Sequence, residues 1–499
     1  MKKISSLLIA ILLLLNTYPV VSFADDDNIQ EEIIYDILVD RFNNGNQAFS
    51  DQVRIDDPLA YHGGDIEGIK LKLDDIKKLG FTTITLSPIM ENATDGYHGY
   101  WVEDFYSVEE QFGTMEEFQS LVQEAHDRDM KVIIELVTNY VANSHPIVTD
   151  PNMQDWIIPN VKVDITKEPW LEDVAVLNQD NPEVQEMLVD VAKFWLNEGN
   201  VDGFILHAAD QASPNFLEQL SSEIKVENSN AYIIADVLGE EVPQELKEIQ
   251  AIDVIDNPEL SNTIANVFSS VDNPVDQIYE KWDELGIENS LLYVDNKTID
   301  RFTQVAAANK RDDVNTWNLV LVSLLTTPGV PIIFQGSDIP MYGAGIEQIH
   351  RLINFNSGEQ ELEEVFSRVL ALRNEFPALQ YGDYELVGSD KGMSLYKRTY
   401  QNEIMYIAIN NDSVSRVVSI PDLESGLQLR GLLGDNIVRE INDGEYKVGL
   451  ARESADVFIV EENSGVNWGF VAPVIIIIFL FVIAVVYLSR KQKKREIEE

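Results

Sequence analysis

The chain has 499 residues and contains no cysteine. No disulfide bond therefore holds its fold, and thiol chemistry is excluded from any functional site. Basic residues are scarce as well, because 36 Lys and Arg stand against 85 Asp and Glu, which gives a formal net charge of -49. So large a negative charge argues against nucleic acid or anionic lipid as a partner of the folded part, and it keeps an exposed surface soluble.

The sequence also lacks the glycine-rich patterns that bind phosphate, since neither Gly-x-Gly-x-x-Gly nor a P-loop occurs in it. This absence disfavours a nucleotide-binding sheet. An apolar content of 45% is ordinary for a globular protein. The length accommodates one large barrel with a smaller domain, or two to three domains.

The two ends of the chain carry targeting signals. Lys2 and Lys3 precede a short apolar run that ends in small residues at Ala24, so residues 1–24 are predicted to be a secretory signal peptide. An uncleaved N-terminal anchor is the alternative. Near the other end, residues 469–488 are apolar and uncharged, and at about 1.5 Å per residue they can cross a bilayer as one helix.

The residues around this apolar segment predict its orientation. Residues 463–468 form a short linker before it, and a basic tail follows at residues 489–499. Clustered Lys and Arg stay on the cytoplasmic side of a membrane. We therefore expect a single-pass protein of the cell membrane, with residues 25–468 outside the cell and the lipid bilayer as a partner of the C-terminal helix alone.

Between these ends, helix-like segments alternate with short, continuously apolar strands. The segment pairs are 66–79 with 82–86, 114–128 with 130–138, 182–197 with 201–211, and 216–224 with 231–237. Continuously apolar strands indicate a parallel sheet covered by helices. The number of such units over residues 25–382 fits a (β/α)8 barrel better than an open doubly wound sheet.

Two segments depart from this alternation. Residues 141–176 are polar and irregular, and they are predicted to be an excursion between two of the units. Residues 383–462 contain short strands, several of them alternating, separated by Gly, Asn and Asp, which is typical of a small antiparallel β-domain.

The apolar stretch 201–211 is the strand on which the function depends most. Ile205 and His207 lie two residues apart, so on a strand they point to the same face. In a barrel of such strands, the residues at the C-terminal ends line the active site. These two positions are therefore candidate site residues.

Several motifs resemble, in order and spacing, those of the α-amylase family of glycoside hydrolases, glycoside hydrolase family 13, over nearly the whole of residues 31–462. They are Tyr61-His62-Gly63-Gly64-Asp65, Gly96-Tyr97-His98-Gly99-Tyr100-Trp101, Val201-Asp202-Gly203-Phe204, Val294-Asp295-Asn296, Asp300-Arg301-Phe302 and Pro328-Gly329-Val330-Pro331. The resemblance implies a (β/α)8 TIM barrel with a short excursion after its third strand and a C-terminal antiparallel β-sandwich. It also implies a role in carbohydrate metabolism.

The catalytic positions that the resemblance implies are substituted in this chain. The nucleophilic aspartate falls at His207 and its neighbouring arginine at Ile205, while the acid/base glutamate falls at Asp236 and a third carboxylate at Thr298. Retaining glycosidases need two carboxyl groups about 5–5.5 Å apart. A protonated imidazole has the wrong charge to stabilise an oxocarbenium ion, and catalytic geometry tolerates little misplacement. We therefore predict a pseudoenzyme that binds α-glucan or acts as a cell-surface interaction protein.

The alternative is a glycoside hydrolase or transglycosylase that acts on starch or maltooligosaccharides with altered or weak chemistry. In that interpretation the altered mechanism uses His207, Asp236, or the nearby Asp210, Glu240 and Glu241. The fate of the three carboxylate positions favours the inactive protein over this alternative.

Residues that the resemblance implies in sugar binding are partly kept. Tyr100 matches the aromatic ring that stacks on the sugar at the reaction centre, beside His98 and Trp101. The alternative is that this stretch is kept for packing of the barrel. Two substrate-contacting histidines of the family are replaced, by Lys297 and Tyr140.

No cofactor is expected. Calcium is doubtful, because the ligand residues that the resemblance implies are only partly kept. Of three positions that help to hold the family's ion, Asn139 is kept, whereas Val176 and Gln211 replace an aspartate and a histidine. Calcium requires several oxygen ligands. A second site found in some members is partly kept, with Phe49 interrupting it; its residues are Asn44, Asn46, Gly63 and Asp65.

Overall fold

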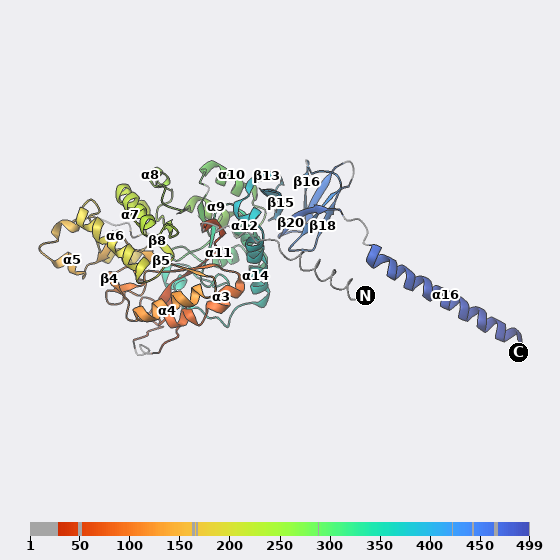
Figure 1. Ribbon diagram of the computed structural model, residues 1–499, viewed down its shortest axis with the longest axis horizontal. Helices are drawn as coiled ribbons and strands as arrows, with labels where there is room; N and C mark the ends of the chain where they lie inside the picture. The colour runs from red at the N-terminus through yellow and green to blue at the C-terminus, as the bar shows by residue number, and fades with distance from the viewer. Residues whose placement is uncertain are drawn as a thin grey trace, which may run out of the picture.

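The computed structural model describes residues 28–47, 52–161, 165, 168–287, 289–421, 423–441, 444–463 and 468–498. The predicted signal peptide, residues 1–24, and most of the predicted linker lie outside these residues. Figure 1 shows the described chain as a large α/β body, followed by a smaller β-domain and a long terminal helix.

Eight parallel strands close into a barrel, in the order β1-β12-β11-β10-β9-β8-β5-β2. Their bounds are β1 Ile34–Ile37, β2 Thr83–Leu86, β5 Lys131–Leu136, β8 Gly203–Leu206, β9 Tyr232–Ala235, β10 Val254–Asp256, β11 Ser290–Leu292 and β12 Val330–Phe334. Almost all of their residues are buried, as expected for strands that face both the barrel interior and the surrounding helices. The predicted barrel is confirmed.

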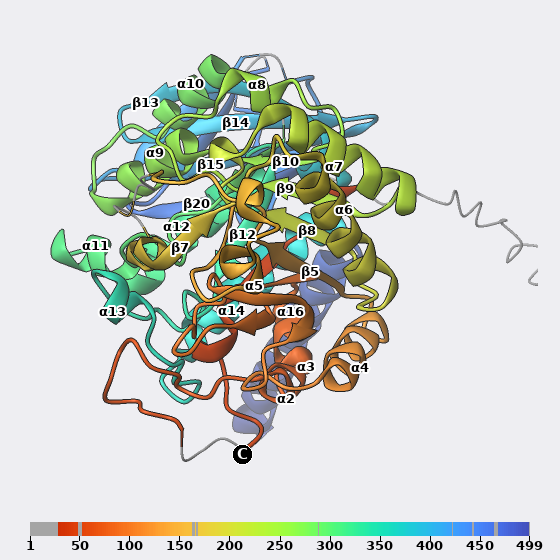
Figure 2. The same ribbon diagram turned by 90° about the vertical axis from the view of Figure 1, so that its left-hand side faces the viewer.

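Helices surround this barrel, as Figure 2 shows. Their bounds are α2 Ile66–Lys70, α3 Leu73–Leu79, α4 Met115–His126, α6 Pro182–Asn197, α7 Pro214–Glu227, α8 Gln244–Lys247, α9 Pro258–Ser269, α10 Asp276–Leu285, α11 Phe302–Ala308, α12 Asp313–Thr326, α13 Ile346–Ile349, α14 Gln360–Glu375 and α15 Pro377–Tyr381. The α4 helix begins with the capping box of Thr114 and Glu117, which satisfies its first backbone N–H groups. The single helix predicted over residues 66–79 is wrong in one respect, because the chain turns at Leu71 and forms two helices.

The excursion leaves the barrel after β5, its third strand, and returns before α6. Strand β6 (Tyr140–Ala142) pairs antiparallel with β7 (Val174–Val176) and closes its base. Between them lie α5 (Pro146–Thr149) and two short 3-10 helices, η3 (Gln154–Trp156) and η4 (Pro169–Asp173). In Figure 2 the excursion, with α5 and β7, lies in front of the barrel strands. A second strand pair, β3 (Met90–Asn92) with β4 (Val102–Val108), follows β2.

The C-terminal domain consists of antiparallel strands, as predicted. A six-stranded sheet in the order β13-β14-β15-β20-β17-β18 faces a two-stranded sheet of β16 and β19, with a separate apolar core. The bounds are β13 Asp383–Asp390, β14 Met393–Tyr400, β15 Glu403–Asn410, β16 Arg416–Ile420, β17 Leu427–Gly431, β18 Ile437–Arg439, β19 Tyr446–Leu450 and β20 Ser454–Glu462.

The last element is the 31-residue helix α16 (Trp468–Glu498), which extends away from the rest of the chain in Figure 1. Within the described residues, its stretch Ala472–Arg490 is the one helix whose length and composition suit a membrane span. This agrees with the apolar segment predicted at residues 469–488.

Candidate functional site

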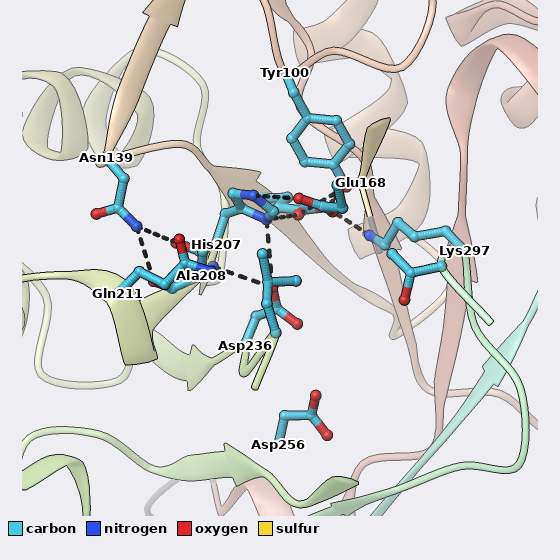
Figure 3. A network of polar contacts seen from close by, with 12 residues as sticks. Tyr100, Asn139, Glu168, His207, Ala208, Gln211, Asp236, Asp256 and Lys297 are labelled. Atoms are coloured by element: carbon cyan, nitrogen blue, oxygen red, sulfur yellow. Dashed lines mark hydrogen bonds and ion pairs between the residues drawn. The ribbon is translucent and has the colours of Figure 1, made fainter. Parts of the chain in front are cut away.

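Charged side chains from five segments meet in the barrel mouth (Figure 3). Four of these residues lie on or just after barrel strands: Glu135 in β5, His207 after β8, Asp236 after β9 and Lys297 after β11. The fifth, Glu168, comes from the excursion just before η4. Because the carboxyl ends of parallel strands meet at one end of a barrel, residues far apart in the chain become neighbours here.

The imidazole of His207 is fully buried and has a carboxylate at each side. Its Nδ1 lies 3.0 Å from Glu135 Oε1 and 3.3 Å from Asp236 Oδ2, and its Nε2 lies 3.1 Å from Glu168 Oε2. The contact with Glu168 is an ion pair that is not aligned as a hydrogen bond. Burial alone lowers the pKa of His207, but these carboxylates outweigh it and hold the pKa well above its ordinary value. The three carboxylates therefore favour the protonated form of the imidazole.

Lys297 supplies a second positive charge, on a side chain that is 15% exposed. Its Nζ lies 2.5 Å from Glu135 Oε2 and 3.7 Å from Asp36 Oδ1. Burial alone would raise the pKa of Glu135, but Lys297 and His207 outweigh it and hold the pKa at about 2. The pKa of Lys297 rises because Asp36 and Glu135 outweigh the opposing effect of burial. Lys297 and Glu135 are therefore a permanently ionised pair.

Ile205 occupies the position where the resemblance implies an arginine. It is 6% exposed and packs in an apolar cluster with Ile133 and Ile234, whose members line the barrel interior. The positive charge that this strand lacks is provided by Lys297 from the loop after β11. An arginine at position 205 and a lysine at 297 would place two cations beside Glu135, so the two replacements fit together.

Asp236 and Thr298 each make hydrogen bonds within the protein, and only Asp236 has a carboxyl group. Asp236 Oδ2 accepts a hydrogen bond from the backbone N–H of Ala208 at 3.1 Å, in addition to its contact with His207. The hydroxyl of Thr298 donates to Asn296 Oδ1 at 2.9 Å and is neutral. These positions are hydrogen-bonded at the barrel mouth.

The other acidic residues considered in the altered-chemistry alternative lie apart from this cluster. Asp210 accepts hydrogen bonds from the backbone N–H groups of Leu238 and Gly239, so it ties two loops together. Glu240 and Glu241 are exposed.

Trp170 of η4 covers the aromatic ring predicted to stack on a sugar. Its ring lies parallel to that of Tyr100, with centroids 5.4 Å apart and an interplanar angle of 5°, and it also stacks on His98 at 5.1 Å. The Tyr100 hydroxyl donates to Glu135 Oε1 at 3.0 Å. Tyr100 is 1% exposed and His98 is 2% exposed. Their predicted roles in sugar binding stay predictions, and their rings are covered by the chain itself.

Two cavities lie on either side of this cover. The inner cavity, bounded by Tyr100, Glu168 and Asp236, has a volume of about 40 Å³. The outer one is a groove of about 760 Å³. Trp101 lines the groove and remains partly exposed, and its Nε1 donates to the Trp170 carbonyl oxygen at 2.7 Å. The groove is therefore the space at the mouth that is large enough for a sugar chain.

The cluster also has the composition of a metal site. Glu135, His207 and Asp236 each place one ligand atom within 4.8 Å of the others. A metal ion would have to displace the imidazole proton, and Lys297 already compensates the charge of Glu135. A metal ion in this cluster would therefore compete with a proton on His207 and with the ammonium group of Lys297.

The residues at the family's calcium position do not fit the ion. The amide Nδ2 of Asn139 donates to the Ala208 carbonyl oxygen at 2.8 Å, and Asn139 Oδ1 accepts from Gln179 Nε2 at 2.7 Å. The hydroxyl of Tyr140 donates to Gln211 Oε1 at 2.9 Å. Side-chain amides therefore satisfy one another where calcium would need a ring of oxygen ligands.

At the second predicted calcium site, the carboxylate of Asp65 forms hydrogen bonds with backbone groups. It accepts hydrogen bonds from the N–H groups of Gly45, Asn46 and Gly68, and it caps the first turn of α2. A Cβ atom at Gly63 would clash with Asn44 Nδ2, so only glycine fits beside this amide. Asn44, Asn46, Gly63 and Asp65 are thus brought together, and calcium binding there stays a prediction.

Sequence reasoning missed two members of the charged cluster. Glu135 lies inside an otherwise apolar strand, and an isolated buried charge in such a strand signals a partner elsewhere. Glu168 lies in an irregular polar segment, where nothing in the local pattern distinguishes it. Lys297 was interpreted as the loss of a histidine, whereas it is the cation that pairs with Glu135.

Comparisons with known proteins agree with this fold. Residues 36–374 match the family model described as alpha amylase, catalytic domain, and residues 382–458 match the alpha-amylase C-terminal domain. The chain is 28% identical over 459 residues to a beta/alpha-amylase of Paenibacillus polymyxa, covering 86% of this chain and 38% of that protein. It is 26% identical over 441 residues to neopullulanase 2 of Thermoactinomyces vulgaris, covering 81% and 73%.

Two solved structures are similar over the whole of their own length. An Anoxybacillus alpha-amylase has a TM-score of 0.83 and 37% identity, covering 88% of this chain and 100% of that one. The alpha-amylase of Geobacillus thermoleovorans, solved as a complex with acarbose, has a TM-score of 0.81 and 34% identity with the same coverage. From its closed barrel, its C-terminal sheets and these matches, the chain belongs to the α-amylase family of glycoside hydrolases.

Proposed function

We propose that this protein is a membrane-anchored extracellular member of the α-amylase family that binds α-glucan without hydrolysing it. The observation that carries the proposal is that His207 stands at the position the resemblance gives to the nucleophile, where three carboxylates contact its ring and favour its protonated form. A nucleophile needs a free electron pair. An imidazolium with a carboxylate at each side offers none.

The remaining chemistry of a retaining glycosidase is also absent from these positions. The oxocarbenium-like transition state needs negative charge beside the sugar ring. At the catalytic and substrate-contacting positions that the resemblance implies, this chain has the positive charges of His207 and Lys297, and Thr298 is neutral. The carboxylates of Glu135 and Asp236 contact these cations, so they are not a pair of independent catalytic groups.

The groove outside the cluster supports carbohydrate as the ligand. Trp101 offers a partly exposed indole there, and aromatic rings suit the C–H faces of pyranoses at low entropic cost. The related Geobacillus thermoleovorans enzyme, solved with acarbose, is a carbohydrate-binding protein. We carry this ligand class, and not that protein's activity, to the present chain.

The anchoring part of the proposal is supported by the two ends of the chain. The signal-like N-terminus and the basic residues in the C-terminal part of α16 favour an outward orientation of the barrel and the β-domain. The apolar length of α16 suits one crossing of the bilayer. A protein held in this way would retain glucan at the cell surface.

A hydrolase with altered chemistry is the second candidate, favoured by Asp236. Its side chain keeps a carboxyl group at the acid/base position, is 25% exposed and borders the inner cavity. This candidate predicts slow release of sugar that depends on Asp236.

Calorimetry and product analysis on one preparation separate the two candidates. The full chain is purified in a detergent without a sugar headgroup, because maltoside headgroups would compete for the groove. Maltoheptaose is expected to bind, and Trp101→Ala to weaken binding about tenfold by removing the aromatic platform. Tyr106→Ala, a change at an exposed ring outside the groove, is the matched control and should leave affinity unchanged. Turnover lost on Asp236→Ala supports the hydrolase instead.

A further inference from the structure

The segment Glu168–Trp170 places a charge and a ring where a sugar at the reaction centre would lie. Glu168 is 1% exposed and contacts the ring nitrogen of His207, while Trp170 is 7% exposed and lies flat on Tyr100. Tyr100 is the ring that stacks on a sugar in the resemblance described above. The innermost sugar site, defined here as the space that lies against the ring of Tyr100, is thus filled by the chain.

The space that remains is too small for a pyranose. The cavity of about 40 Å³ holds a few water molecules at most, because a cavity needs about 10–15 Å³ of such volume for each water. A sugar ring stacked on Tyr100 needs the face that Trp170 covers. Sugar and Trp170 therefore exclude each other at this ring.

The contacts of Trp170 show which part of the side chain matters. Its carbonyl oxygen accepts a hydrogen bond from Trp101, and its ring stacks on Tyr100 and His98. Its own indole N–H is buried and makes no hydrogen bond to the described residues. Stacking, and not the polar tip, holds the ring in place, so phenylalanine should serve as well as tryptophan.

We propose that Glu168–Trp170 is a built-in occupant of the innermost sugar site, a plug that confines α-glucan to the outer groove. The claim that glucan binds in the outer groove rests on the proposed function. The claim that Glu168–Trp170 fills the innermost sugar site does not. Glu168 anchors the plug through its ion pair with His207, and Trp170 covers Tyr100. The replacement of the catalytic aspartate by His207 is then part of the same change, because histidine provides the cation on which Glu168 rests.

A double-mutant cycle on the full chain tests the plug. Tyr100→Ala should leave maltoheptaose affinity unchanged in the wild-type background, because glucan does not reach that ring. Trp170→Ala should tighten binding about tenfold by opening one stacking site, and Tyr100→Ala added to it should remove the gain. Trp170→Phe is the matched control that keeps the plug and the wild-type affinity. Melting temperatures verify that each variant is folded.

Two results would overturn the plug. Weaker binding on Tyr100→Ala in the wild-type background would show that glucan reaches the innermost site. Weaker binding on Trp170→Ala, without dependence on Tyr100, would make Trp170 a sugar platform of the groove.

A ligand-free measurement separates failure of the plug from failure of the proposed function. The fluorescence of wild type minus that of Trp170→Phe reports Trp170, and acrylamide should quench this difference weakly because the ring is buried. Quenching as strong as that of free tryptophan refutes the occupancy. If Trp170 is shielded and no variant binds maltoheptaose, the occupancy stands and the glucan-binding function is refuted.

Discussion

Replacing Lys297 by methionine tests the charged cluster most sharply, because it removes one charge and keeps the length of the side chain. Glu135 is then left buried with His207 as its remaining cation. Lowering the pKa of Glu135 from an ordinary value of 4.5 to about 2 corresponds to about 3 kcal/mol. The attraction of Lys297 is the largest single effect that lowers this pKa, and removing one partner of a buried ion pair usually costs about 3 kcal/mol or more, so we expect Lys297→Met to reduce the free energy of unfolding by about 3 kcal/mol at pH 7.

Urea denaturation followed by tryptophan fluorescence measures this loss. Lys78→Met is the matched control, because the Lys78–Glu363 pair has a contact distance of 2.8 Å but lies on the surface, and it should cause no measurable loss. Adding Glu135→Gln to Lys297→Met should recover part of the stability, because no unpaired charge then remains buried. A Lys297→Met protein as stable as the wild type would refute the ionised pair.

Three further predictions follow from the same contacts. Because the folded-state pKa of His207 is raised, its stabilising contribution is complete below about pH 6.5 and is lost as pH rises toward the folded pKa. The difference in free energy of unfolding between the wild type and His207→Asn should therefore shrink between about pH 6 and pH 9. A difference that grows with pH contradicts a protonated His207. Removing calcium with EGTA should leave the melting temperature unchanged, since amide groups satisfy Asn139 and backbone N–H groups occupy Asp65, and a fall of several degrees would reveal a bound ion. A variant with the family's residues restored should not hydrolyse glucan while Trp170 is present; its changes are Ile205→Arg, His207→Asp, Asp236→Glu and Thr298→Asp. Adding Trp170→Ala to these four changes should give detectable hydrolysis. Product release by the four changes alone contradicts the plug.

Much of the fold follows from local sequence signals. The helix at Pro182–Asn197 has the predicted bounds, because an Asn-Pro helix start is a strong local pattern. The strand Val254–Asp256 was not predicted, since three residues are too few to show a period. Three strands of the C-terminal domain, β17 to β19, were missed for a similar reason.

The sequence predicts some side chains of the barrel mouth and does not predict the residues that contact them. Ile205, His207, Asp236 and Thr298 could be placed because nearby motifs fix their positions. The ion pair of Lys297 with Glu135 joins residues 162 positions apart, and no local pattern encodes such a contact. The same holds for Glu168 and Trp170, whose positions depend on how the excursion folds back over the barrel mouth.

The central claim is that this chain binds α-glucan and leaves it intact. Maltoheptaose is incubated for a long time with a saturating amount of the full-length protein, and the bound sugar is recovered. Mass spectrometry of the recovered sugar tests both the binding and the absence of cleavage. The account predicts that maltoheptaose is recovered from the protein at its original length. Shorter sugars whose formation stops on Asp236→Ala would contradict it.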